Sequence, residues 1–212
     1  MKLVQSGNLE SRFDPETANK LDDTSRLVII VGVARGILEM YNHHIIHRDL
    51  KPDNILLNES NEPLICDLGS SRQYSDDGMN KMSTLVGTPI YSAPEMIATD
   101  ISHIYRYEVD VYSFGIIMYQ VLKNVQASNV YNKNATTVYQ VLKLKLENEI
   151  PDLSGLHELF VGLITDCWNT TIDVRPDPPT IWDMLVGAVR DRVQLLPNAN
   201  LDRVNEYIDK IK

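Results

Sequence analysis

Residues 108–122 are apolar around the whole circumference of the helix that they predict, and this feature constrains the fold most strongly. The apolar members are Val109, Val111, Tyr112, Phe114, Ile116, Ile117, Met118, Tyr119, Val121 and Leu122. Because a helix that is hydrophobic on every side is buried, this segment belongs at the centre of a domain. The sequence therefore predicts a globular domain with a buried central helix.

Amphipathic patterns predict further helices on both sides of this segment. Asp23-Thr24-Ser25 is a capping sequence ahead of a broad apolar face that continues to Tyr41. Three amphipathic helices are expected over residues 134–146, 153–168 and 178–190, and a weak helix over residues 205–212 is expected to close the chain.

Short apolar runs predict a few strands in the first third of the chain. Ile45-Ile46 and Ile55-Leu56-Leu57 flank a polar loop, and Leu64-Ile65-Cys66 follows a turn at residues 58–63. Residues 70–88 are polar and without periodicity, which indicates a functional loop or disorder. The expected fold class is mainly α with a few short β-strands, and no linker divides the chain into two domains.

Composition excludes several kinds of partner. The chain of 212 residues is 43% apolar with a net charge of −9, which argues against a surface that binds nucleic acid or an anionic membrane. Its longest apolar stretch, residues 27–34, is far shorter than the roughly 20 residues that cross a bilayer. Cys66 and Cys167 have no metal-binding or disulfide spacing. We expect a cytoplasmic protein without a nucleic-acid or membrane partner.

One polar loop carries the chemistry. It reads His47-Arg48-Asp49-Leu50-Lys51-Pro52-Asp53-Asn54, and Asp67-Leu68-Gly69 follows downstream. Phosphoryl transfer requires a base for the acceptor hydroxyl, a cation for the phosphate charge and hard oxygen ligands for magnesium. Asp and Asn also favour turns, so each residue alone has an ordinary structural explanation. The combined string makes that explanation improbable.

The two strings resemble the catalytic loop and the magnesium motif of eukaryotic protein kinases. The resemblance implies that Asp49 orients and deprotonates the substrate hydroxyl and that Lys51 neutralises the transferred phosphate. It also implies that Asn54 and Asp67 hold Mg²⁺ beside ATP. Leu68, which precedes Gly69, stands where the family usually has Phe.

The resemblance assigns supporting roles to three further residues. Arg48 would meet a phosphorylated residue of the activation loop, and His47 would pack beneath the catalytic loop. Asp110, at the start of the central helix, would accept backbone N–H groups of this loop. A buried carboxylate without such donors would be unstable.

Downstream strings agree with the family in order. Residues 87–95, Gly-Thr-Pro-Ile-Tyr-Ser-Ala-Pro-Glu, resemble the substrate-docking end of the activation segment and include Thr88. Glu95 would form a buried ion pair with Arg175, although two unrelated surface charges are the alternative. Ser83 and Thr84 are the expected regulatory phosphosites, with unmodified, solvated hydroxyls as the alternative.

Two features indicate the kind of kinase. Lys51-Pro52 favours a serine or threonine acceptor, by resemblance. Cys167-Trp168 and residues 86–89 favour the tyrosine-kinase-like group of serine/threonine kinases, although Trp168 can equally serve core packing.

The N-terminal residues 1–9 resemble the kinase hinge and the first helix of the large lobe. Main-chain groups of Lys2 and Val4 would then bind adenine, with a random surface segment as the alternative. Leu56 and Cys66 are assigned to the nucleotide pocket, although a small core residue explains Cys66 equally well.

The resemblance covers residues 1–190, with residues 191–212 as a helical tail, and it is confined to the large (C-terminal) lobe. No G-x-G-x-x-G string and no Val-Ala-x-Lys strand occur in the 212 residues. We therefore expect a truncated kinase domain that binds ATP poorly and transfers phosphate slowly to a protein substrate. The alternative is a catalytically silent binding module. An exposed apolar seam that recruits a partner is expected at Met1, Leu3, Val4, Leu56 and Leu68.

Overall fold

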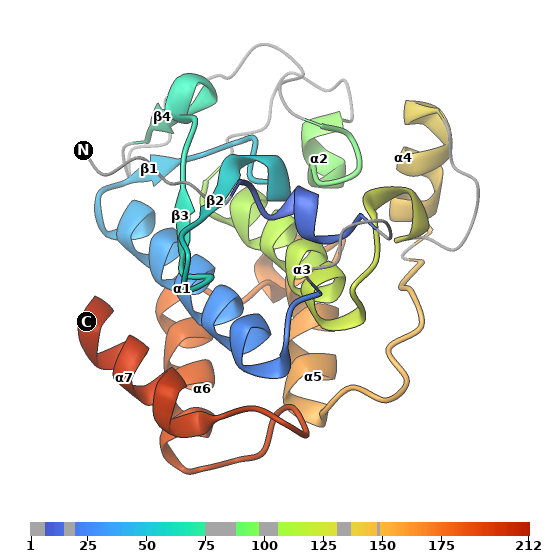
Figure 1. The fold of residues 1–212 in the computed structure, drawn as a ribbon. Helices are drawn as coiled ribbons and strands as arrows, with labels where there is room; N and C mark the ends of the chain where they lie inside the picture. Colours follow the sequence, from blue (N-terminus) through green and yellow to red (C-terminus); the bar gives the residue numbers. More distant parts are fainter. Residues whose placement is uncertain (1–6, 15–19, 75–87, 98–105, 131–136, 148) are drawn as a thin grey trace.

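A computed structural model describes residues 7–14, 20–74, 88–97, 106–130, 137–147 and 149–212. This part of the chain is mostly helical, with a few short strands (Figure 1). The helices are α1 (Asp23–Asn42), α2 (Pro94–Ile97), α3 (Glu108–Lys123), α4 (Val138–Leu146), α5 (Glu158–Cys167), α6 (Pro178–Arg190) and α7 (Leu201–Ile211). The strands are β1 (Ile45–Ile46), β2 (Ile55–Leu57), β3 (Pro63–Ile65) and β4 (Arg72–Gln73).

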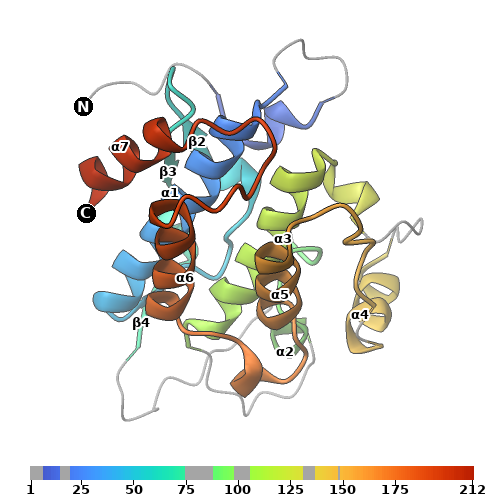
Figure 2. The same ribbon diagram turned by 90° about the horizontal axis from the view of Figure 1, so that it is seen from below.

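Helix α3 lies at the centre, as its apolar circumference predicts. Every residue from Val109 to Leu122 is buried, including Asp110, Ser113 and Gln120. α1 and α5 both pack against it, as Figure 2 shows. Gly115 permits the close approach of α5, because a Cβ atom at this position would lie 2.9 Å from the Cβ of Cys167.

Helix α1 packs between the central helix α3 and the C-terminal helices α6 and α7. Its N-cap is Asp22, whose side chain accepts from the backbone N–H of Ser25 at 2.6 Å. α1 packs against α3, α6, α7 and β3. At Gly32 the backbone of α1 approaches β3 and α7 closely, since a Cβ atom there would lie 2.4 Å from both Pro63 Cγ and Tyr207 Oη.

The strands form two antiparallel pairs. β2 and β3 make a hairpin in which Ile55 lies opposite Ile65, and the Gly7–Leu9 segment bonds to the outer edge of β2. β1 pairs with β4. The sequence pattern did not predict β4, because Arg72-Gln73 is short, polar and exposed and so has no apolar alternation.

Three predicted helix starts were wrong by several residues. α4 starts at Val138 after the capping box of Thr137 and Gln140, and α5 starts at Glu158 after the cap of His157. α7 starts at Leu201, not residue 205, because Asn200 caps its first turn. α7 is also no weak helix, since its apolar face is buried on α1 and α6.

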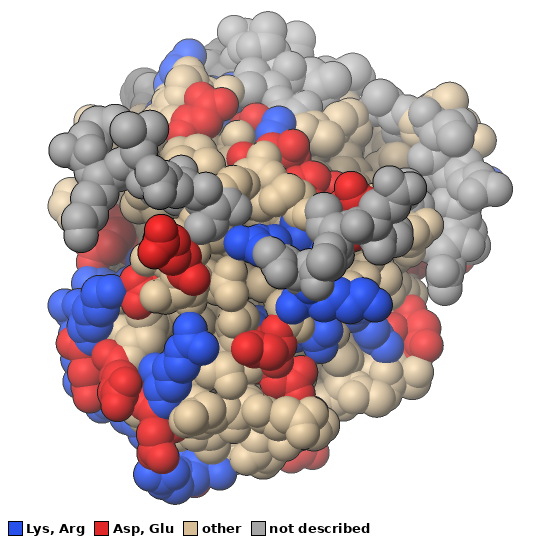
Figure 3. Space-filling view, viewed as in Figure 1, with Lys and Arg blue, Asp and Glu red and all other residues tan. Residues whose placement is uncertain are grey.

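The described helices include none that is long and apolar enough to cross a membrane. On the face in Figure 3, basic and acidic side chains are intermingled over the described surface and are not gathered by sign.

Candidate active site

Asp49 is the centre of a compact polar network. Its Oδ2 atom lies 3.0 Å from Lys51 Nζ and accepts from Asn54 Nδ2 at 3.2 Å. Its Oδ1 atom accepts from the backbone N–H of Thr88 at 3.2 Å. An ionised carboxylate offers about four acceptor positions, so roughly one is left for an incoming hydroxyl. The network therefore holds a carboxylate in one orientation and leaves it able to accept a proton.

Lys51 and Asn54 are themselves held in place. Lys51 Nζ donates to Thr88 Oγ1 at 3.0 Å, and Asn54 Nδ2 also donates to the backbone oxygen of Asp49 at 2.8 Å. Because the amide nitrogen of Asn54 is directed to Asp49, its oxygen is the atom available for a cation.

Asp110 anchors the loop of residues 47–54. Its two oxygens accept the backbone N–H groups of His47 and Arg48, at 2.7 Å and 2.9 Å. Burial raises the pKa of the Asp110 carboxyl, whereas these two hydrogen bonds oppose the shift. The buried carboxylate predicted at the start of the central helix thus has two backbone donors.

His47 is fixed between two backbone groups. Its Nε2 lies 2.9 Å from the carbonyl oxygen of Cys66 and must donate to it, while Nδ1 accepts from the backbone N–H of Asp49 at 3.3 Å. This pattern corresponds to the neutral tautomer with a proton on Nε2. The ring therefore ties the 47–54 loop to Cys66, which follows β3 and precedes Asp67.

Two residues of the site have left-handed backbone conformations. Arg48 has φ +70° and Asp67 has φ +63°, which are uncommon values for residues with side chains. Such conformations persist where surrounding bonds hold them, and they cluster at functional sites. Arg48 is held by Asp110, and the Asp67 carboxylate accepts from the backbone N–H of Gly69 at 3.3 Å.

The open end of the β2–β3 hairpin brings Asn54 close to Asp67. The backbone N–H of Cys66 donates to the Asn54 carbonyl at 2.9 Å, so the residue before β2 lies across from the residue preceding Asp67. One amide oxygen and one exposed carboxylate fit Mg²⁺, which usually takes one or two protein oxygens beside phosphates and water. The described residues contain no cluster of three or more His, Cys, Asp or Glu that could hold a metal ion alone.

Glu95 and Arg175 form a two-pronged ion pair. Arg175 Nη1 and Nη2 donate to the two carboxylate oxygens at 2.6 Å and 2.9 Å, and the side chains are only 0% and 8% exposed. Arg175 also donates to the carbonyl oxygens of Asn169 and Glu108. The pair therefore fixes the end of the 88–95 segment to the helical core.

The remaining predicted residues are placed less uniformly. Leu56 is half-buried in β2, and Leu68 and Gly69 are exposed at the open end of the hairpin. Burial, and then the neighbouring Asp67 carboxylate, raises the pKa of the half-buried Cys66 thiol. Lys2, Val4, Ser83 and Thr84 lie outside the described residues, as do Met1 and Leu3 of the predicted seam.

Two buried polar residues near the site were missed from the sequence. Lys145 of α4 donates to the carbonyl oxygens of Ile90 and Ser92. The Ser113 hydroxyl of α3 donates to the carbonyl oxygen of Tyr91. No sequence signal could have identified Lys145, because a lysine in an amphipathic helix ordinarily faces solvent. Ser113 interrupts an apolar helix and was the only available hint.

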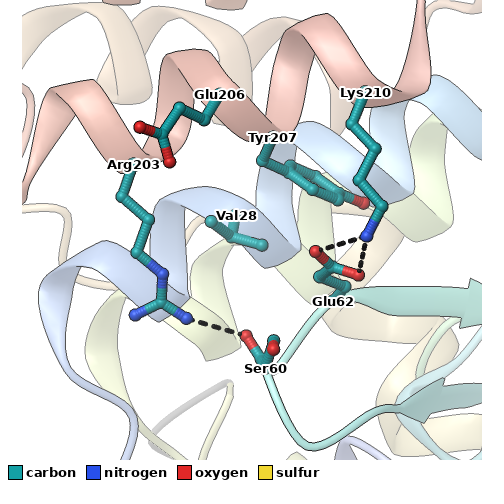
Figure 4. A pocket seen from close by; sticks show the side chains of 7 residues that line it. All are labelled: Val28, Ser60, Glu62, Arg203, Glu206, Tyr207 and Lys210. Atoms are coloured by element: carbon teal, nitrogen blue, oxygen red, sulfur yellow. Dashed lines mark hydrogen bonds and ion pairs between the residues drawn. The ribbon is translucent and has the colours of Figure 1, made fainter.

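A groove of about 220 Å³ lies away from this site, at the turn end of the hairpin. Figure 4 shows α7 side chains facing the turn, with Lys210 paired to Glu62 and Arg203 bonded to the Ser60 carbonyl. Val28, Glu206 and Tyr207 complete the lining. The groove therefore contains none of the residues around Asp49.

Comparison with known proteins identifies the family. The family model of the protein kinase domain matches residues 1–185 of the sequence. The chain belongs to the protein kinase domain family. Helix α7 lies beyond the matched residues.

The curated relatives are protein kinases by name, and two of the three described below are named serine/threonine kinases. Cysteine-rich receptor-like protein kinase 18 of Arabidopsis thaliana is 35% identical over 195 residues, covering 83% of this kinase chain. Serine/threonine-protein kinase CTR1 of the same plant is 31% identical and covers 82% of it. RGS domain-containing serine/threonine-protein kinase A of Dictyostelium discoideum is 33% identical and covers 74%. The chain spans only 29%, 21% and 13% of the lengths of these relatives.

Proposed function

We propose that this chain provides the large lobe of a kinase that transfers the terminal phosphoryl group of ATP to a serine or threonine hydroxyl of a protein. The observation that carries the proposal is the network in which Lys51, Asn54 and Thr88 hold the Asp49 carboxylate. A binding module without catalysis would have no need for a carboxylate, an ammonium and an amide in this arrangement. Lys51-Pro52 favours the serine or threonine acceptor.

The residues of the network divide the work of the transfer. The acceptor hydroxyl gives its proton to Asp49 while its oxygen bonds to phosphorus and the bond from phosphorus to the ADP oxygen breaks. Lys51 Nζ, 3.0 Å from Asp49, lies where it can neutralise charge on the transferred group. Asn54 and Asp67 would hold Mg²⁺, which when bound neutralises phosphate charge.

The proposal assigns four residues to the binding of the nucleotide. The adenosine part of ATP would contact Leu56, Cys66 and the main chain of Lys2 and Val4. The 212 residues contain neither a Gly-rich phosphate loop nor the lysine that usually accompanies it. The isolated 212-residue polypeptide is therefore proposed to bind ATP weakly and to transfer phosphate slowly, because water is not excluded from the phosphates.

Several finer assignments are proposals of the same kind. Phosphorylation of Ser83 or Thr84 would add an anion that can pair with Arg48 and order the segment. Exposed apolar side chains such as Leu68, 54% accessible, would be covered by a hydrophobic partner surface. Residues 86–89 and Cys167-Trp168 support the tyrosine-kinase-like group. The two unpaired cysteines fit the reducing cytosol.

Radiolabel transfer tests the function. The chain is incubated with Mg²⁺, ATP labelled on its terminal phosphate and a serine- and threonine-rich acceptor such as casein, and the labelled amino acids are identified. We expect slow labelling of serine or threonine that Asp49→Asn abolishes. Glu59→Gln, which removes the same charge from the exposed hairpin turn, serves as the control and should label like the wild type.

Two outcomes would contradict the proposal. Labelling that persists in Asp49→Asn would show that Asp49 is not the base. Prolonged incubation at high protein concentration without any label that depends on Asp49 would support a catalytically silent binding module.

A further inference from the structure

Lys145 is a buried lysine that the proposed chemistry does not use. Its residue is only 1% exposed, although lysine is almost never fully buried without partners. The Nζ atom donates to the carbonyl oxygens of Ile90 at 2.8 Å and Ser92 at 2.6 Å. It also lies 4.6 Å from the centre of the Tyr112 ring. The three N–H groups of the ammonium therefore have two carbonyls and an aromatic face as partners.

The charges around Lys145 act in opposite directions. The Glu95 carboxylate attracts the ammonium, whereas the Arg175 guanidinium, which lies 4.9 Å from the same Tyr112 ring, repels it. Burial lowers the pKa of Lys145 well below its usual range. An apolar residue at this position would avoid the cost of burying a charged group. It could not bond to the two carbonyls, which requires a long side chain with a donor.

Both carbonyls belong to the segment that reaches the catalytic carboxylate. At one end, Thr88 donates its backbone N–H to Asp49 and receives a bond from Lys51. At the other end, Glu95 is fixed by Arg175. Between these ends, the Ser113 hydroxyl bonds to the Tyr91 carbonyl from the central helix. Lys145 bonds to the carbonyls on either side of Tyr91.

These contacts determine the path of the segment. Three successive carbonyls, those of Ile90, Tyr91 and Ser92, are each bonded to a side chain from α3 or α4. A peptide unit whose carbonyl is fixed cannot rotate independently of its neighbours. α4, which carries Lys145, lies at the edge of the molecule beside α2 (Figures 1 and 2).

We propose that Lys145 is a positioning residue that shapes the 88–92 segment for the acceptor protein and so determines how tightly the acceptor binds. This inference rests on the proposed function, because it requires that the protein accepting the phosphate docks on this segment. Lys145 acts through Ile90 and Ser92 and does not take part in the transfer. Its loss therefore affects acceptor binding and leaves ATP binding unchanged.

The test compares Lys145→Met with Lys143→Met. Methionine is unbranched and of similar length to lysine, so it can fill the same space without donating to the carbonyls. Lys143 is on the same helix, but its side chain is 61% exposed and lies 3.7 Å from Glu147, so Lys143→Met is a matched control. Lys145→Gln, which keeps amide donors on a shorter side chain, is a second variant in case the methionine variant does not fold.

The first measurement is hydrogen exchange of the Tyr91 and Ser92 amides, which donate to the Thr88 carbonyl at 2.9 Å and 3.2 Å. In Lys145→Met we expect these amides to exchange about tenfold faster, which corresponds to about 1.4 kcal/mol of local opening. Lys145→Gln should lie between this variant and the wild type, and Lys143→Met should match the wild type.

The second measurement is the steady-state transfer of phosphate to casein. Lys145→Met should raise the KM for casein about tenfold, with the KM for Mg²⁺–ATP and kcat unchanged. A variant that lowers Tm but leaves both the amide exchange and the casein KM at wild-type values would overturn the proposal, since a merely structural lysine would behave in this way.

The two measurements separate the two proposals. Absence of Asp49-dependent transfer in the wild type would contradict the proposed function, and the link from Lys145 to acceptor binding would fail with it. The exchange rates of Tyr91 and Ser92 would still decide whether Lys145 holds the segment.

Discussion

Single side chains in this kinase chain hold backbone that has no regular structure of its own. Asp110 bonds to the backbone N–H groups of His47 and Arg48, and Arg175 bonds to two carbonyls in addition to Glu95. A buried polar group that loses its partner costs about 1–3 kcal/mol. The stability of the loop therefore depends on a small number of charged residues.

Asp110→Asn tests this dependence. An amide offers one oxygen in place of two, so one backbone N–H of the loop should lose its acceptor. We expect a loss of about 1–3 kcal/mol in the free energy of unfolding, measured by urea denaturation. Asp173→Asn, at an exposed position, is the control. An Asp110→Asn protein as stable as the wild type would show that the carboxylate does not anchor the loop.

Arg175→Met tests the buried ion pair. It leaves the Glu95 carboxylate buried without its main partner, and we expect a loss of about 3–5 kcal/mol. The control is Arg192→Met, because Arg192 and Asp202 form an ion pair of similar length, 2.7 Å, but their side chains are 66% and 71% exposed. Its cost should stay below about 1 kcal/mol. Equal losses in the two variants would contradict the importance given to burial.

The relative positions of the helices and strands depend on points where their backbones approach closely. α1 contacts the β3 strand and α7 at the same point, where Gly32 leaves no room for a side chain between Pro63 and Tyr207. Because the hairpin carries Asn54 and Asp67 at its other end, this contact also locates the site relative to the core.

Gly32→Ala should therefore destabilise the fold. The added methyl group would lie 2.4 Å from the Pro63 ring, which cannot move aside as a flexible side chain would. We expect a loss of about 1–3 kcal/mol in thermal or urea unfolding. Gly187→Ala in α6, where a Cβ atom meets nothing within 4 Å, should instead stabilise by about 0.5–1 kcal/mol. Stabilisation by both variants would contradict the contact.

The elements differ in how well the sequence predicts them. The apolar circumference of α3 predicts both its helix and its burial, because this pattern requires no knowledge of its neighbours. The starts of α4, α5 and α7 depend on single caps such as Thr137 and Asn200, which periodicity does not register. β4 exists only through its pairing with β1, which is a long-range property.

The candidate site shows the same division. Asp49, Lys51 and Asn54 are neighbours in sequence, so a local string predicts them together. Lys145 reaches Ile90 and Ser92 from a distant helix, and its residue type predicts a surface position. Tertiary contacts of this kind lie outside what residue spacing can predict.

The molecule as a whole buries several phenol groups. Burial is the main cause that raises the pKa of Tyr91, Tyr119 and Tyr207, and it raises the pKa of Tyr107 to about 12, with the Glu108 carboxylate contributing. In the unfolded chain a phenol ionises near pH 10. The unfolded state therefore loses these protons first as the pH rises.

Stability should decline above about pH 10 for this reason. The contribution of Tyr107 is complete below about pH 10 and is lost by about pH 12, since its folded pKa is about 12. Tyr107→Phe should make the decline shallower in this window, measured as the urea midpoint at successive pH values. The exposed Tyr139→Phe is the control. A decline unchanged by Tyr107→Phe would contradict the assignment.

Divalent-dependent nucleotide binding tests the central claim, that Asn54 and Asp67 hold a metal ion beside Asp49. We would measure the binding of Mn²⁺–ATP to the chain through the paramagnetic resonance of Mn²⁺, for the wild type, Asp67→Asn and the Glu59→Gln control. We predict weak binding to the wild type and the control, and binding at least about tenfold weaker, or 1.4 kcal/mol, for Asp67→Asn. Equal binding by the wild type and Asp67→Asn, or ATP binding that needs no divalent ion, would contradict the claim.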